Sequence, residues 1–237
     1  MKNTARISGI NSKAARIRAA FKRKIMKAFY KELPDNYEMV FKVDANGKKT
    51  ILLLTLGNLL ITAVFLALVI ALPFIYTPAS ATPRLAPDIY LFMFAILLIL
   101  YIILHELTHG AAYKILTHEK LTFGITLTCP FCGVPDIYVS RRTSIIALCS
   151  PLVVFSIIFV ALSIGMYFYD YYLFYVFGGL FAFHIGGCVG DIYDLVLLNG
   201  RFKDDRILVK DTGPVQMFYL PVKPDEECSV RSSGIQD

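Results

Sequence analysis

The chain has 237 residues, of which 56% are hydrophobic and 18% are charged, and none is Trp. Soluble domains usually contain about 45–50% apolar and about 25% charged residues. The mean hydropathy of +0.59 and long apolar blocks exclude a soluble globular enzyme, a disordered or collagen-like chain and a disulfide scaffold. The net charge of +6 suits the anionic cytoplasmic leaflet of a bilayer. We expect no nucleic acid partner, because the chain lacks a glycine-rich phosphate loop and a basic, aromatic stacking segment.

Residues 1–50 are expected to form a cytoplasmic flank. Apolar residues recur every three or four positions over 7–28, with Lys and Arg between them. This spacing predicts a basic amphipathic helix on the membrane surface, and a flexible, solvated basic tail is the alternative. A short strand is predicted over 37–43, followed by a turn over 44–47 that leads into the first apolar block.

Four apolar blocks are each long enough to cross a bilayer, which takes about 20 residues. Lipid offers no hydrogen bonds to the backbone, so each block must be a helix. The sequence therefore predicts an all-α membrane protein with four transmembrane helices, which form one domain over residues 51–198. The four blocks are 51–76, 89–116, 144–169 and 171–198.

The distribution of Lys and Arg predicts the orientation in the cell membrane. Of the 24 Lys and Arg residues, 23 precede the first block, lie from Lys114 at the end of the second block to the start of the third, or follow the fourth. Loops rich in positive charge stay in the cytoplasm. We therefore expect the N- and C-termini, including the tail at 199–237, to be cytoplasmic.

Small β-hairpin elements are expected on the cytoplasmic side. Within the loop 117–143, strand-like residues at 121–128 precede a turn at 130–135 and an extended stretch at 136–140. In the tail, residues 206–221 indicate one or two short strands.

The second apolar block ends with the sequence His105-Glu106-Leu107-Thr108-His109. Histidines at positions i and i+4 lie on the same face of a helix and can bind one zinc ion. The Glu beside the first His can then act as a general base toward a water on the metal. Ionisable side chains inside an apolar helix are costly, which favours function over structure here. The alternative is a cytoplasmic helix end where these groups simply reach water.

A catalytic zinc needs a third protein ligand. At 1.5 Å per residue, His105 lies about 24 Å from the outer end of its helix, and Asp191 lies about 27–30 Å along the fourth block. These depths match, so Asp191 is the favoured ligand. Asp194 is the alternative, and whichever Asp does not bind is expected to hydrogen-bond a ligating His. Gly186 and Gly190 could bring the fourth block close to the second.

Three further side chains are candidates with weaker signals. His184 lies two turns before Asp191 and could donate to a developing oxyanion or serve as an alternative ligand. It could equally be a buried neutral His bonded to a neighbouring carbonyl. Cys129 and Cys132 form a CxxC pair, but no second pair accompanies them, so we interpret them as reduced thiols in a turn.

Several motifs together carry a resemblance to a known family. The chain resembles the putative zincin peptidases, a bacterial family of small multi-pass membrane proteins, over about residues 33–220. It is more distantly similar to the site-2 intramembrane metalloproteases, in which an HExxH helix pairs with a later span that supplies an Asp ligand. The shared features are Leu33-Pro34, the segment 105–110, the Cys- and Pro-rich turn 129–135, the segment 190–192 and Asp211-Thr212-Gly213.

The small-Gly-Pro element of the site-2 proteases is matched loosely by residues 147–151. Ser150 stands where those proteases have Gly, and Ile192 stands where they have Gly after the ligand Asp.

The leading hypothesis is a zinc-dependent intramembrane or juxtamembrane endopeptidase that cleaves membrane-anchored proteins. His105, His109 and Asp191 would bind zinc, and Glu106 would be the general base. A non-enzymatic metal-binding membrane scaffold is one alternative. A small metal transporter is another, but the first and third blocks carry almost no ionisable residues along a crossing path.

Overall fold

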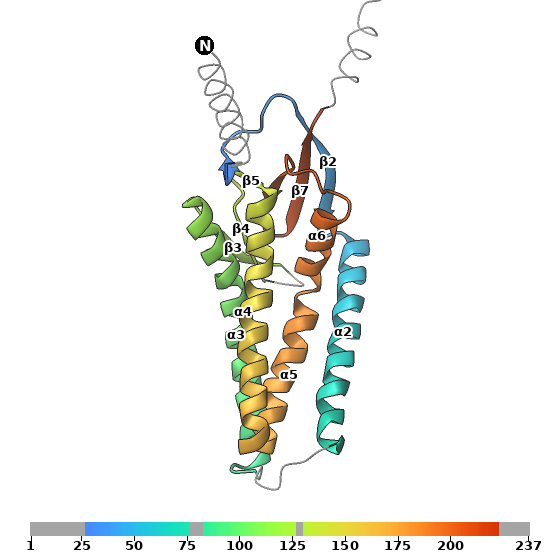
Figure 1. The fold of residues 1–237 in the computed structure, drawn as a ribbon, viewed down its shortest axis with the longest axis vertical. Coiled ribbons are helices and arrows are strands. Elements are labelled where there is room, and N and C mark those ends of the chain that lie inside the picture. The colour runs from blue at the N-terminus through green and yellow to red at the C-terminus, as the bar shows by residue number, and fades with distance from the viewer. Residues whose placement is uncertain (1–26, 76–82, 127–129, 223–237) are drawn as a thin grey trace, which may run out of the picture.

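The computed structural model describes residues 27–75, 83–126 and 130–222. The amphipathic helix expected over 7–28 therefore lies almost entirely outside the described residues, and so does Cys129. The described part of the chain is a bundle of long helices with a β-sheet at one end (Figure 1).

Three helices of the described chain are long and apolar enough to cross a membrane: α2 (Lys48–Ile75), α3 (Pro87–Thr117) and α4 (Arg141–Tyr169). They coincide with the first three apolar blocks. The sequence suggested one continuous helix for the fourth block, but the structure has two. This block forms α5 (Tyr171–Gly187) and α6 (Val189–Asn199), which meet at an angle of 45° and make a fourth crossing if they are counted as one bent span.

The break between α5 and α6 falls at Cys188, in a segment rich in glycine. Gly186 and Gly187 precede it, and Gly190 follows it. Glycine is a poor helix former because it gains backbone freedom when the helix opens. The local sequence therefore weakens the helix just before Asp191.

Gly186 packs against the first span and not the second, which corrects the expectation from the sequence. A Cβ on Gly186 would overlap the hydroxyl of Thr62 and lie 3.0 Å from the carbonyl oxygen of Asn58, both on α2. A Cβ on Gly190 would meet no heavy atom within 4 Å. Small residues on α5 thus bring α2 close, and α2 becomes a wall of the site described below.

Asp170 ties two helix ends together at the end of the bundle away from the sheet. Its Oδ1 accepts hydrogen bonds from the backbone N–H groups of Tyr172 (2.9 Å) and Leu173 (3.2 Å), which caps α5. Its Oδ2 accepts from the Tyr90 hydroxyl (2.6 Å) and the Arg84 N–H (3.1 Å) at the start of α3. Burial raises the pKa of Asp170, but these hydrogen bonds outweigh burial and hold the pKa below its usual value.

The strands outside the helix bundle form a larger sheet than the separate hairpins expected. Five strands pair in the order β1-β5-β6-β7-β2, and each neighbouring pair is antiparallel. An isolated two-stranded hairpin is marginally stable, which favours joining these segments into one sheet. The strands are β1 (Phe29–Tyr30), β2 (Tyr37–Asp44), β5 (Tyr138–Ser140), β6 (Leu208–Asp211) and β7 (Val215–Pro221).

One face of this sheet packs onto the helix ends that carry the candidate site. Val139, Val209 and Phe218 from the strands are at most 3% exposed and belong to one apolar core with Tyr113 and Leu198 from the helices. The sheet is therefore anchored on α3 and α6, where the chemistry-bearing residues lie.

A separate hairpin follows α3, and its second strand lies where the sequence suggested a turn. β3 (Thr122–Ile125) pairs with β4 (Pro130–Gly133), so most of the expected turn is a strand. Pro130 is tolerated because it is the first residue of its strand. The Phe131 ring packs directly on Gly213. Glycine is required there because φ is +94° and because a Cβ would overlap the Phe131 ring.

Candidate metal centre

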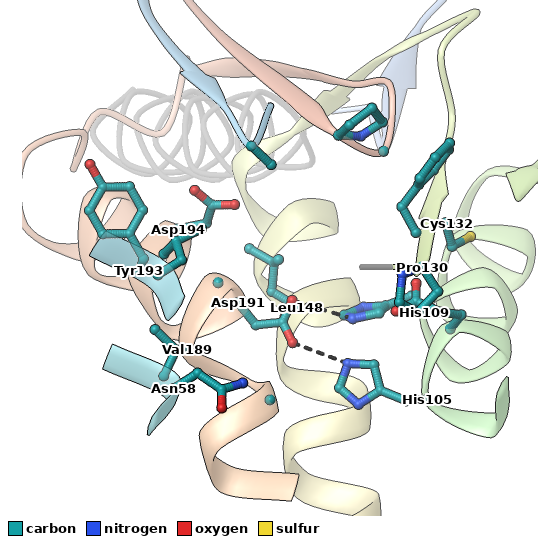
Figure 2. A pocket seen from close by; sticks show the side chains of 18 of the residues that line it. Asn58, His105, His109, Pro130, Cys132, Leu148, Val189, Asp191, Tyr193 and Asp194 are labelled. Carbon is teal, nitrogen blue, oxygen red and sulfur yellow. Dashed lines mark ion pairs between the residues drawn. The ribbon is translucent and has the colours of Figure 1, made fainter. Parts of the chain in front are cut away.

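Two imidazoles and one carboxylate converge from two elements that are distant in sequence. His105 and His109 lie one turn apart on α3, each 8% exposed, with ring centroids 4.9 Å apart. Asp191 reaches them from the first turn of α6. Its Oδ2 lies 3.4 Å from His105 Nε2, and its Oδ1 lies 3.3 Å from His109 Nε2 (Figure 2).

These separations fit a shared zinc ion. Zinc in proteins is tetrahedral with bonds of about 2.0–2.1 Å to N and O, which places neighbouring ligand atoms about 3.3–3.4 Å apart. One ligand atom from each of His105, His109 and Asp191 lies within 4.8 Å of the others. Two imidazole nitrogens and a carboxylate oxygen also form a donor set that catalytic zinc sites use, with a fourth position left for water.

The helix break between α5 and α6 orients Asp191. The depth argument from the sequence assumed straight helices, whereas Asp191 begins a new helix that runs at 45° to α5. The N-terminal end of a helix favours a negative charge. The carboxylate therefore gains from its own helix as well as from the two imidazoles.

A backbone carbonyl fixes the tautomer of His109. The Nδ1 of His109 lies 2.9 Å from the Ala147 carbonyl oxygen on α4. A carbonyl only accepts, so Nδ1–H donates and Nε2 keeps its lone pair toward Asp191. Pro151 stands four residues after Ala147 and has no N–H, which leaves this carbonyl without its usual helical partner. The Pro in segment 147–151 thus frees the acceptor that His109 uses.

His105 is held by a side chain instead. Its Nδ1 lies 3.1 Å from the hydroxyl oxygen of Tyr101, one turn earlier on α3. The Tyr101 hydroxyl also lies 2.9 Å from Nδ1 of His184. Tyr101 was not singled out from the sequence, although its i−4 spacing to His105 was a usable signal.

His184 lies behind the candidate ligands and is not among the residues that line the main cavity. It is 0% exposed. Its Nε2 lies 3.3 Å from the Leu152 carbonyl oxygen and 3.2 Å from the Ser156 hydroxyl. Both ring nitrogens therefore contact α3 or α4, which leaves neither to meet a substrate oxyanion in the cavity.

A cavity of about 590 Å³ opens beside the two imidazoles and Asp191, and Glu106 lines it. Its walls come from α2, α3, the α5–α6 region and the strands β4 and β7 with their turns. Asn58 on α2 contributes a carboxamide on the wall shown in Figure 2. The cavity is large enough for an extended peptide segment of a few residues beside Glu106.

Asp194 lies near a different set of groups. It is 5% exposed and points away from the imidazoles (Figure 2). It lines the main cavity and also a small cavity of about 10 Å³, which it shares with Ser144, Tyr113 and Asp211. Within the described chain, Asp194 Oδ1 and the Ser144 hydroxyl have no hydrogen-bond partner. Asp194 is therefore neither a member of the group formed with His105 and His109 nor bonded to either His.

Asp211 joins the sheet to the helix that carries both imidazoles. Its Oδ2 accepts a hydrogen bond from the Tyr113 hydroxyl (2.7 Å), and its Oδ1 accepts from the Gly213 N–H (2.8 Å). Burial raises the pKa of Asp211. Sequence reasoning noted Asp211-Thr212-Gly213 only as part of the resemblance, because its partner Tyr113 is 98 residues away.

Cys132 lies in β4 and lines the main cavity. Burial raises the pKa of the Cys132 thiol to about 12, so it stays protonated at neutral pH. It is a free thiol, but in a strand rather than in the expected turn.

Comparison with known proteins agrees with this geometry. Residues 98–204 match the family described as "Putative zincin peptidase". The match is to the family suspected from the sequence, and it spans both imidazoles, Glu106 and Asp191. It supports a metallopeptidase and implies zinc. No curated protein and no solved structure matches the chain.

Proposed function

We propose that this protein is a zinc-dependent intramembrane or juxtamembrane endopeptidase that hydrolyses peptide bonds in membrane-anchored proteins. The observation that carries the proposal is the approach of Asp191 to within 3.3–3.4 Å of both Nε2 atoms. Two His and one Asp would hold the metal, and Glu106 would be the catalytic base.

Each residue has a chemical role in the reaction. Zinc, when bound, would lower the pKa of a coordinated water and polarise the peptide carbonyl. Glu106 would take the proton from the attacking water and later deliver it to the leaving amine. Asp191 would complete the set of three protein ligands with His105 and His109, and the cavity walls would keep bulk water from the peptide.

The membrane setting follows from charge and from the arrangement of the helices. We propose that residues 51–198 cross the cell membrane four times, with α5 and α6 as one bent crossing. Segments 1–50 and 199–237 would then be cytoplasmic, with the basic N-terminal segment on the anionic leaflet. The shared sheet of β2 and β7 supports placing both flanks on one side. Reporter fusions at each terminus test this orientation.

The substrate would be a membrane-anchored protein with a locally unwound segment. β4 lines the cavity beside His109 and, in the described chain, is paired only with β3. Its other edge could accept an added strand, whose backbone would hydrogen-bond to β4. This arrangement would hold a peptide extended next to Glu106.

The test compares wild type with Glu106→Gln in zinc-containing membranes. New protein N-termini in membrane-anchored proteins are expected with wild type and not with Glu106→Gln, and a zinc chelator should abolish them. Glu119→Gln is the matched control, because Glu119 follows the same helix but pairs with Lys31 (3.1 Å) away from the cavity. Equal cleavage by Glu106→Gln would contradict the mechanism, and no cleavage by wild type would favour the scaffold.

A further inference from the structure

Behind His105, a chain of hydrogen bonds leads away from the cavity and across three helices. His105 Nδ1 lies 3.1 Å from the Tyr101 hydroxyl, which lies 2.9 Å from His184 Nδ1. His184 Nε2 lies 3.3 Å from the carbonyl oxygen of Leu152 on α4. The chain therefore connects α3, α5 and α4 through two side chains that the proposed chemistry does not use.

The far end of this chain determines where each proton lies. A carbonyl oxygen can only accept, so Nε2–H of His184 donates toward Leu152, and the Ser156 hydroxyl oxygen, 3.2 Å from the same nitrogen, is then a second acceptor. In a neutral His184, Nδ1 is then an acceptor and accepts a hydrogen bond from the Tyr101 hydroxyl. The Tyr101 oxygen is left to accept from Nδ1–H of His105, so Nε2 of His105 keeps its lone pair toward Asp191. This is the tautomer that a metal ligand needs.

The surroundings of His184 are apolar and favour its neutral form. Tyr101 is 6% exposed and His184 is 0% exposed. The rings of Phe155 and Phe159 each lie 6.0 Å from the His184 ring, centroid to centroid. A charge in such apolar surroundings is costly. Were His184 doubly protonated, Tyr101 would have to donate toward His105, and a hydrogen would occupy the metal-binding nitrogen.

We propose that Tyr101 and His184 are positioning residues, which hold His105 in the tautomer and ring orientation that bind the metal. The inference rests on the proposed zinc site and adds two residues to it. It also explains why the two imidazoles need different support. His109 uses a carbonyl freed by Pro151, whereas His105 has no such carbonyl and uses a tyrosine that a second histidine orients.

A competing use of the same atoms is a second metal ion. His105, His184 and Cys188 each offer a ligand atom, and these atoms lie within 4.8 Å of one another. However, the Tyr101 hydroxyl already contacts both Nδ1 atoms, at 3.1 and 2.9 Å. A metal there would have to displace it. The hydrogen-bonded chain is therefore the arrangement we infer, and a second metal is an outcome that the experiment can reveal.

The experiment measures zinc affinity by chelator competition on the full-length protein in detergent. Tyr101→Phe removes the hydroxyl and leaves the ring. Losing a hydrogen-bond partner of a metal-ligating His typically costs about 10–100-fold in affinity, and we expect that loss here. Tyr175→Phe is the matched control, because its hydroxyl contacts Tyr171 (2.7 Å) on the same bundle and no candidate ligand. It should leave zinc affinity unchanged.

Substitutions at His184 separate hydrogen bonding from folding. His184→Asn keeps an acceptor oxygen near the position of Nδ1, so its zinc affinity should stay close to the wild-type value. His184→Leu removes it and should match Tyr101→Phe. The double variant Tyr101→Phe/His184→Leu should be no weaker than either single variant, since both act through one chain. In the cobalt-substituted protein, Tyr101→Phe and His184→Leu should shift the visible absorption bands, and Tyr175→Phe should not.

The outcomes keep this inference separate from the proposed function. If wild type, Tyr101→Phe and His184→Leu each bind one zinc with equal affinity, the positioning role is overturned and the zinc site stands. A second tightly bound zinc in wild type, lost with Cys188→Ser, would overturn it in favour of a second metal. Folded wild type that binds no zinc would instead overturn the zinc site itself.

Discussion

Asp191 and Asp194 lie one turn apart on α6, yet their surroundings differ. Asp191 begins the helix beside two imidazoles, with its oxygens 3.4 and 3.3 Å from their Nε2 atoms. Asp194 lies beneath the sheet in a cavity of about 10 Å³, together with Asp211. Both residues follow the same 45° break, so their positions around α6 decide which carboxylate reaches the imidazoles.

The largest expected effect is on the rate of peptide cleavage, at the candidate metal centre that contains Asp191. Glu106→Gln removes the general base and keeps the shape of the side chain, so peptide cleavage should fall by about 10²–10⁴-fold. Zinc content should stay at the wild-type value, because Glu106 is not in the group formed by the two imidazoles and Asp191. Single-turnover cleavage and zinc content, measured on the same sample, check this pair of results. Loss of zinc in Glu106→Gln would contradict the assigned role.

The next effect comes from the support of His109. Pro151→Ala restores a backbone N–H that competes for the Ala147 carbonyl, so zinc affinity should fall by about 10-fold or more. Ala is also a better helix former than Pro, so the metal-free protein should be as stable as wild type or more stable. Chelator competition and thermal unfolding measure the two quantities. A parallel fall in both would indicate a general packing defect instead.

A third prediction concerns the small cavity that Asp194 shares with Tyr113 and Asp211. Tyr113→Phe removes the hydroxyl that donates to Asp211 Oδ2 at 2.7 Å. A buried acceptor left without its donor costs about 1–3 kcal/mol. The free energy of unfolding should fall by that amount, while zinc affinity stays at the wild-type value. A large loss of zinc affinity, measured by chelator competition, would show that the two carboxylate regions are not independent.

The smallest expected effect is at Asp170, far from both regions. Its pKa is held below the usual value, so its stabilising contribution is present above the unfolded pKa of about 3.9 and is lost as pH falls through the folded pKa. Asp170→Asn weakens the bonds from Tyr90 and Arg84 and should cost about 0.5–1.5 kcal/mol at neutral pH. Thermal unfolding below about pH 4 should show the two proteins converging. A constant difference across this range would exclude the carboxylate charge as the cause.

Much of this molecule could be predicted from local patterns. The long apolar blocks gave the helices, and the i, i+4 spacing placed His105 and His109 on one face. Matching helix depths predicted that Asp191 lies near the two imidazoles, as the structure has it, because rise per residue is a property of the backbone alone.

Other features depend on contacts between distant segments, which no local pattern encodes. The five-stranded sheet joins residues from both flanks and from the loop before α4. Tyr113 and Asp211 meet across 98 residues, and Tyr101 and His184 across 83. The glycines around Cys188 are a local signal for a weakened helix, but the angle of the break depends on packing of α5 and α6 against α2 and α4.

The most direct test of the central claim is the zinc content of a matched pair, Asp191→Asn and Asp194→Asn, against wild type. Both substitutions change one carboxylate to an amide on the same helix. If Asp191 is the third ligand, we expect about one zinc per chain in wild type and in Asp194→Asn, and little in Asp191→Asn. Zinc retained by Asp191→Asn and lost by Asp194→Asn would contradict it.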